Sequence, residues 1–195
     1  MILMTMLTAL AAPIDTLPHD PTALPPRLSQ ATDGLRFTDK HGLNIVTWDT
    51  RHSVSVWHYR IQGGRLFLVN TAFRARPDCD DDLAFGLSGG VAVTDADSDG
   101  TAEVTFAVEE ACVTDVSARD LEITLWEGGE QYTVSGQSIW WDSAQGGTVV
   151  PLVFDHRLAS QPALLQRAEQ HFDAIIEAER TRWGDDVVLR RQSIR

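Results

Sequence analysis

A short aspartate-rich segment has the residue types and the spacing that bind a metal ion. Asp95, Asp97 and Asp99 are separated by single residues, and Gly100 follows directly. Three carboxylates this close repel one another unless a hard cation neutralises them. Gly100 allows a sharp turn that aims the Thr101 carbonyl at the same point, and oxygen atoms are the ligands that calcium prefers. The segment predicts a calcium (Ca²⁺) site; a solvated acidic turn is the alternative, because Asp and Gly also favour turns.

The segment departs from an EF-hand calcium loop at the last ligand position. If Asp95 is position 1, an EF-hand requires glutamate at position 12, where this chain has Phe106. The acidic residue falls at position 9 instead, as Glu103, and the flanking residues alternate as strands do. This spacing resembles the calcium loops of FG-GAP-type β-propeller repeats, which implies a shell closed by Glu103. Because the motif occurs once, the resemblance extends to the ligand positions and not to the propeller.

A second acidic stretch surrounds one of the two cysteines. Asp78, Asp80, Asp81 and Asp82 flank Cys79. They could form a secondary cation site or complete the first shell from outside. The alternative is a solvated loop, because contiguous aspartates cannot all face one ion.

The two cysteines, Cys79 and Cys112, bear on the compartment. In an exported chain they are most simply one disulfide, which would close a loop around the aspartate-rich segment and brace it. In a cytoplasmic protein two buried thiols would be the better interpretation.

The first residues favour export. Residues 1–12 form an apolar run that is too short to span a bilayer and resembles the apolar part of a signal peptide, although no basic residue precedes it; a frayed apolar tail is the alternative. Five prolines follow between Pro13 and Pro26, so residues 13–34 are expected to be an extended tether. The folded domain is then residues 35–195, and the expected location is periplasmic or secreted.

The remaining pattern predicts an α+β fold that is mainly β. Residues 53–61 and 65–73 alternate around a Gly-Gly turn, as do 121–126 and 131–135, which predicts an antiparallel meander of hairpins. Apolar residues recur at helical spacing between about 160 and 183, which predicts one amphipathic C-terminal helix packed on the sheet.

Composition excludes one class of partner and supplies a core. The chain has 195 residues, 43% of them hydrophobic, which is enough to bury a core. With 28 acidic and 16 basic side chains, its formal charge of −12 repels phosphate backbones, so nucleic-acid binding is not expected.

One motif suggests an enzyme, but its context does not. Gly86-Leu87-Ser88-Gly89-Gly90 matches the Gly-x-Ser-x-Gly of hydrolase nucleophile elbows. That elbow joins a strand to a helix, whereas a strand pattern follows here, so a loop of small residues ahead of the strand is the simpler interpretation.

Several segments, taken in order, carry a resemblance to one family. They are His52–Tyr59, Asp78–Cys79, Val93–Val104, Ala111–Ser117 and Leu121–Gly128. Together they resemble a family of small exported bacterial proteins labelled surface polysaccharide biosynthesis proteins. Where that family typically has proline after Cys-x-x-Asp-Val-Ser, this chain has Ala118. The resemblance implies a cell-envelope setting and no particular reaction.

These observations favour a non-catalytic, calcium-stabilised exported domain that binds a cell-envelope partner. The partner would be a glycan or a protein, and an immunity-type inhibitor is one form of this hypothesis, because acidic charge speeds association with a basic toxin. The alternative is an envelope glycan-acting hydrolase that uses calcium for structure.

Overall fold

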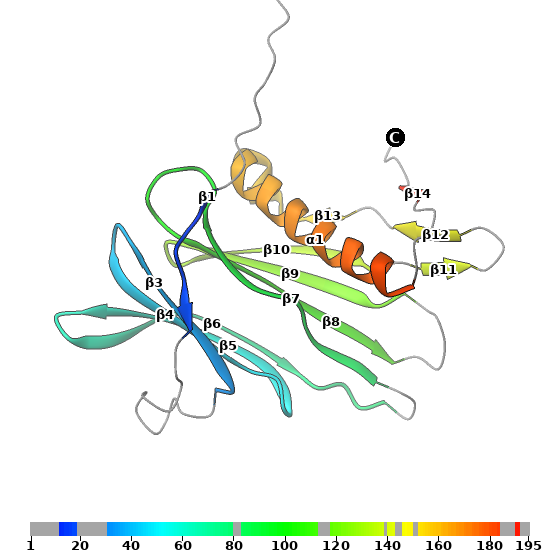
Figure 1. The fold of residues 1–195 in the computed structure, drawn as a ribbon, viewed down its shortest axis with the longest axis horizontal. Helices are drawn as coiled ribbons and strands as arrows, with labels where there is room; N and C mark the ends of the chain where they lie inside the picture. The colour runs from blue at the N-terminus through cyan, green and yellow to red at the C-terminus, as the bar shows by residue number, and fades with distance from the viewer. Residues whose placement is uncertain are drawn as a thin grey trace, which may run out of the picture.

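The computed structural model describes residues 12–18, 31–79, 83–112, 118–138, 140–142, 146–149, 152–183 and 190–191. Two antiparallel sheets and one long helix form three layers (Figure 1). The six-stranded sheet, called the second sheet below, lies between the five-stranded first sheet and the helix. The mainly-β α+β fold predicted from the sequence is confirmed.

The first sheet contains five strands in the order of the chain. They are β2 (Leu17–Pro18), β3 (Asp33–Asp39), β4 (Gly42–Asp49), β5 (Ser53–Gln62) and β6 (Arg65–Ala75). The predicted hairpin is β5–β6, and Gly63 and Gly64 in its turn both have positive φ, which only glycine adopts readily.

The second sheet contains six strands, with the order β1-β7-β8-β9-β10-β13. They are β1 (Ala12–Pro13), β7 (Leu83–Asp95), β8 (Glu103–Cys112), β9 (Asp120–Glu127), β10 (Glu130–Gln137) and β13 (Val153–Phe154). The predicted hairpin around Gly128 and Gly129 is β9–β10. A smaller sheet contains β11 (Trp140–Asp142), β12 (Gly146–Val149) and β14 (Arg190–Arg191).

Alternate residues of the second sheet face different layers. Toward the first sheet, Val104, Phe106 and Trp126 are buried, and the rings of Phe106 and Trp126 meet edge to face with centroids 4.9 Å apart. Because both faces of β8 are covered, its residues from Glu103 to Val108 are all buried.

The predicted C-terminal helix covers the other face of the second sheet. A 3₁₀ helix, η2 (His156–Ser160), leads into α1 (Pro162–Trp183), which lies along β7–β10 (Figure 1). The buried residues of α1 recur at helical spacing and contact buried leucine and isoleucine side chains of β9; they are Leu164, Ala168, Phe172, Ile175 and Ile176.

The Gly86–Gly90 motif lies inside β7 and beneath this helix. The pairing of β7 with β8 shifts between Ser88 and Val91, which marks a bulge. A Cβ on Gly89 would lie 2.8 Å from the Ile175 side chain, so glycine is needed there for the close approach of α1. The motif is therefore neither a strand-to-helix elbow nor the loop expected from the sequence, but part of a strand.

The proline-rich stretch pairs with both sheets where it is described. Ala12 and Pro13 pair with β7, and Leu17 and Pro18 pair with β3. Proline cannot donate to a ladder but is tolerated on edge strands, which is where β1 and β2 lie. This corrects the expectation of a tether separate from a domain that begins at residue 35; β3 itself begins at Asp33. Residues 1–11, with most of the expected signal peptide, lie outside the described residues.

Cys79 and Cys112 form the expected disulfide, with their Cα atoms 5.6 Å apart. Cys79 lies in the connection between β6 and β7, so the bond ties this connection between the sheets to the end of β8. Among the described residues, no helix is both long and apolar enough to cross a membrane.

We predict that two buried histidines make the protein less stable as the pH falls. His58 and His171 are each 4% exposed, and burial lowers the pKa of both to about 4. In the unfolded chain they take up protons near pH 6.5. Their contribution is therefore complete above about pH 6.5 and is lost as the pH falls toward about 4, by up to ~1.4 kcal/mol per pH unit for each histidine.

Urea unfolding of the wild type and of the double variant His58→Gln, His171→Gln between about pH 7 and pH 5 measures this effect. The wild type should lose more unfolding free energy than the variant over that range. Equal losses would contradict the prediction.

Candidate metal centre

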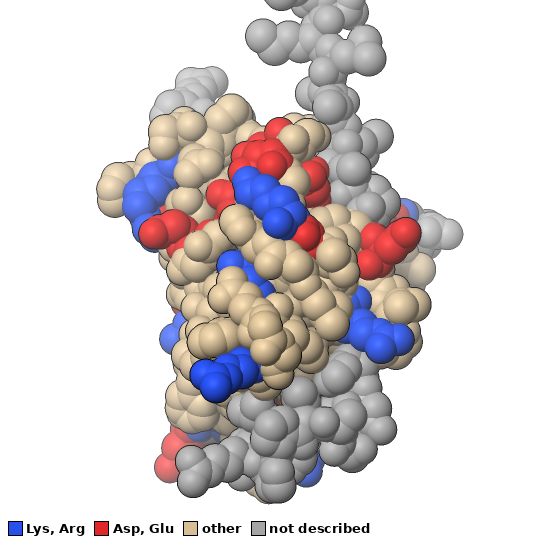
Figure 2. Space-filling view, turned by 90° about the vertical axis from the view of Figure 1, so that its left-hand side faces the viewer, with Lys and Arg blue, Asp and Glu red and all other residues tan. Residues whose placement is uncertain are grey.

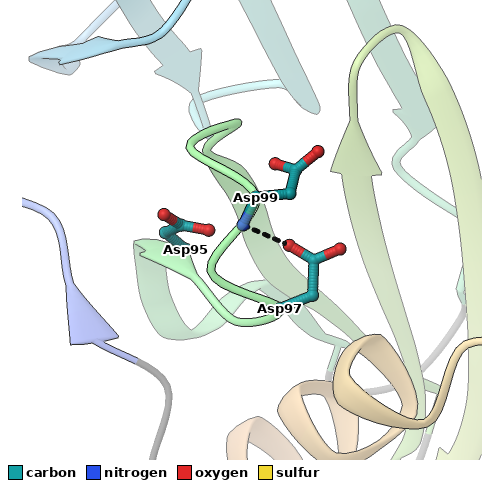
Figure 3. Close-up of side chains that lie close together, drawn as sticks. All are labelled: Asp95, Asp97 and Asp99. Carbon is teal, nitrogen blue, oxygen red and sulfur yellow. Dashed lines mark hydrogen bonds between the residues drawn. The ribbon is translucent and has the colours of Figure 1, made fainter.

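The aspartate-rich segment forms the connection from β7 to β8, and its own side chains hold its shape. Asp95 Oδ2 accepts a hydrogen bond from the Gly100 N–H at 3.1 Å. Asp97 Oδ1 accepts a hydrogen bond from the Asp99 N–H at 3.1 Å (Figure 3). The Thr101 N–H donates to Asp99 Oδ1 at 2.6 Å. Side-chain acceptors of this kind fold the backbone back on itself.

Carboxylate oxygens from the segment gather into an outer group, which consists of Asp95, Asp97 and Asp99. One oxygen of each lies within 4.8 Å of the others, and the last two side chains are exposed. Figure 2 displays acidic side chains gathered around a basic one at one end of the molecule.

Lys40, the one lysine of the chain, already neutralises part of the outer group. Its Nζ donates to Asp99 Oδ2 at 2.6 Å and to the Asp99 carbonyl at 3.1 Å. Lys40 and then the hydrogen bonds from Thr101 lower the pKa of Asp99 to about 2.

A second set of carboxylates, the inner group, lies beneath the segment and consists of Asp97, Glu103 and Glu127. One oxygen of each lies within 4.8 Å of the others. Glu103 begins β8, Glu127 ends β9, and the register that pairs Val104 with Trp126 brings the two glutamates together. Asp97 belongs to both groups.

Glu103 is the most constrained residue of the inner group. Its side chain is fully buried; Oε2 accepts from Thr94 Oγ1 at 3.0 Å and from the Ala96 N–H at 2.6 Å. Its Oε1 and Glu127 Oε1 are both buried and have no hydrogen-bond donor in the rest of the chain. The two carboxyl groups lie close enough to hydrogen-bond to each other when one of them is protonated. Burial raises the pKa of Glu103 to about 8 and raises the pKa of Glu127 as well.

This donor set fits a hard cation. Buried oxygen atoms without a partner cost free energy, and grouped carboxylates add mutual repulsion. A divalent ion among them would remove both costs, and hard ions accept carboxylate oxygens.

Two neighbouring elements hold the segment in place. From the turn between β3 and β4, the Lys40 N–H donates to the Gly100 carbonyl at 2.8 Å, and the buried carboxylate of Asp39 accepts from the Ala102 N–H at 3.3 Å. From α1, Arg167 interacts with the inner group through charge: burial lowers the pKa of Arg167, and the charge of Glu103 opposes that effect.

The five metal ligands predicted from the sequence do not all lie together in the structure. Asp95, Asp97 and Asp99 come together, and Glu103 joins Asp97 in the inner group. Thr101 is buried, and its N–H donates the hydrogen bond to Asp99 Oδ1 that helps to hold the turn. The sequence reasoning missed Glu127, Lys40 and Arg167, because these residues approach the segment only through strand register and helix packing.

The second acidic stretch lies mostly outside this description. Asp78 is exposed, beside the disulfide, and Asp80, Asp81 and Asp82 lie outside the described residues. The secondary cation site suggested there stays a prediction.

Comparisons with known proteins add no relative. Neither the models of known protein families, nor curated proteins, nor solved structures gave a match to this chain. The resemblance to an exported envelope family therefore stays an expectation from the sequence.

We predict that Gly100→Ala destabilises the segment. Gly100 has φ +84°, and an added Cβ would make only ordinary contacts with Lys40, so the cost comes from the backbone conformation. That cost is about 1–2 kcal/mol of unfolding free energy for a residue with a side chain.

Gly86→Ala is the matched control, because its added Cβ meets open space and its φ is not in the left-handed region. Chemical denaturation of both variants measures the difference. A stability of Gly100→Ala equal to that of the control would contradict this account of the turn.

Proposed function

We propose that the protein is an exported, calcium-stabilised domain that binds a cell-envelope partner without catalysing a reaction. The observation that carries the calcium claim is Glu103: a fully buried carboxylate with one unpartnered oxygen, next to two other carboxylates. A glutamate in this position is costly without a cation and favourable with one.

Calcium fits the donors better than magnesium does. Carboxylates from three places in the chain contribute oxygens, and Asp97 is exposed, so solvent can complete the shell. Calcium accepts irregular shells of this kind, whereas magnesium demands near-octahedral geometry and retains its waters.

The disulfide supports the exported setting. Cys79–Cys112 ties the β6–β7 connection to the end of β8, and structural disulfides persist in oxidising compartments. Calcium-binding modules outside the cytoplasm work with weak sites of about 0.1–1 mM affinity. The disulfide and the calcium site therefore suit the same environment.

Strand β6 supports the binding role. It lies at the edge of the first sheet and exposes large apolar side chains, with Phe73 69% exposed, Leu68 55% and Phe67 48%. Exposed aromatic side chains on an edge strand suit contact with a glycan ring or with a strand of a protein partner. The net charge of −12 would speed association with a basic partner.

We predict that calcium stabilises the protein through the aspartate-rich segment. The unfolding temperature of the full chain should rise with calcium concentration up to about 1 mM and above, because the ion binds only the folded state. Asp97→Ala should abolish the rise, since Asp97 belongs to both groups of carboxylates.

Asp173→Ala is the control for loss of an acidic side chain; it removes an exposed carboxylate on α1 and should keep the calcium response. Equal unfolding temperatures in calcium, magnesium and EDTA (a chelator) would contradict the calcium claim.

We predict binding without turnover for the envelope partner. The full chain, incubated in calcium with purified peptidoglycan, exopolysaccharide or envelope protein fractions, should be retained by one of them and release no soluble fragments. Phe73→Ser should reduce retention, because it removes an exposed aromatic side chain.

Release of fragments that stops when a single carboxylate is replaced would favour the alternative, a glycan-acting hydrolase. Unchanged retention of Phe73→Ser would remove β6 from the binding surface.

A further inference from the structure

The two carboxylate groups differ in how many of their oxygens already have partners. In the outer group, Asp95 Oδ2, Asp97 Oδ1 and both oxygens of Asp99 accept hydrogen bonds from the backbone or from Lys40. Solvent reaches the exposed side chains of Asp97 and Asp99 and screens their charges. One outer oxygen, Asp95 Oδ1, is buried without a partner; the other outer oxygens accept hydrogen bonds or belong to exposed side chains.

The inner group has less of this compensation, although the charge of Arg167 acts on Glu103. Glu103 Oε1 and Glu127 Oε1, from adjacent strands, are both buried and have no hydrogen-bond donor in the rest of the chain. The two carboxyl groups can hydrogen-bond to each other only when one of them is protonated. Two glutamates that face each other in a poorly hydrated site repel strongly when both are ionised. A cation placed between them would gain more than one placed among the outer aspartates.

We propose that the divalent cation binds in the inner group, with Asp97, Glu103 and Glu127 as its carboxylate ligands, and that Asp99 is the ion-pair partner of Lys40 rather than a ligand. This inference rests on the proposed calcium site and changes its ligands: Glu127 lies 24 residues beyond Glu103, outside the aspartate-rich segment.

The position of the ion decides what it stabilises. An ion in the outer group would bind only residues of the aspartate-rich segment and would stabilise that segment alone. An ion in the inner group joins the segment, the start of β8 and the end of β9, immediately before the β9–β10 turn. Calcium would then hold these three parts of the middle sheet together. The β3–β4 turn of the first sheet, which contains Lys40, contacts the segment at the same place.

Calorimetric titration of the full chain with calcium chloride tests the assignment through two conservative variants. Glu127→Gln should weaken calcium binding more than tenfold, because an amide oxygen replaces an ionised ligand in a buried site. Asp99→Asn should change the affinity less than about threefold, because only a screened charge outside the shell is lost.

Glu130→Gln is the matched control. Glu130 pairs with Glu127 across the β9–β10 hairpin, but its side chain is 70% exposed, so its replacement should leave calcium affinity unchanged. In EDTA, Glu127→Gln should unfold at the same temperature as the wild type or higher, because one of the repelling carboxylates is gone.

The outcomes separate the two proposals. If the wild type binds calcium, and Glu127→Gln binds as tightly while Asp99→Asn does not, the ion belongs in the outer group and the present inference is wrong while the calcium claim stands. If the wild type binds no calcium, the proposed function loses its calcium claim and the inference fails with it.

Discussion

The burial of one carboxylate, that of Glu103, constrains the structure around it. Glu103 begins the central strand β8, which is covered on both faces and places its side chain where water does not reach. Thr94 and the backbone of Ala96 donate hydrogen bonds to one oxygen, and the other oxygen has no donor outside the inner group. A cation is the partner that would make this burial favourable rather than costly.

The three layers of the fold converge at this position. The β3–β4 turn contacts the aspartate-rich segment through Asp39 and Lys40, β9 contributes Glu127, and α1 brings Arg167 near Glu103. At the opposite end of β8, the disulfide ties the strand to the β6–β7 connection, which runs between the two sheets. A covalent bond would thus stabilise one end of β8 and an ion the other end, which suits a small exported domain.

Local features of the sequence predicted the local features of the structure. The hairpins around Gly63 and Gly128, the C-terminal helix and the aspartate-rich turn follow from period and turn chemistry within short windows. Glu127 could not be found this way, because its approach to Glu103 depends on the register of β8 with β9. The pairing of the proline-rich stretch also depends on strands that are distant in the sequence. Prolines exclude a central strand, but they do not show whether a stretch pairs at the edge of a sheet.

The position of the bound ion is the most direct test of this account. A crystal of the full chain grown with calcium, with anomalous differences measured, locates the ion without relying on any variant. The account predicts one peak about 2.3–2.6 Å from oxygens of Asp97, Glu103 and Glu127, with Lys40 still paired to Asp99. A peak among Asp95, Asp97 and Asp99 with Lys40 displaced, or no peak at either group, would contradict it.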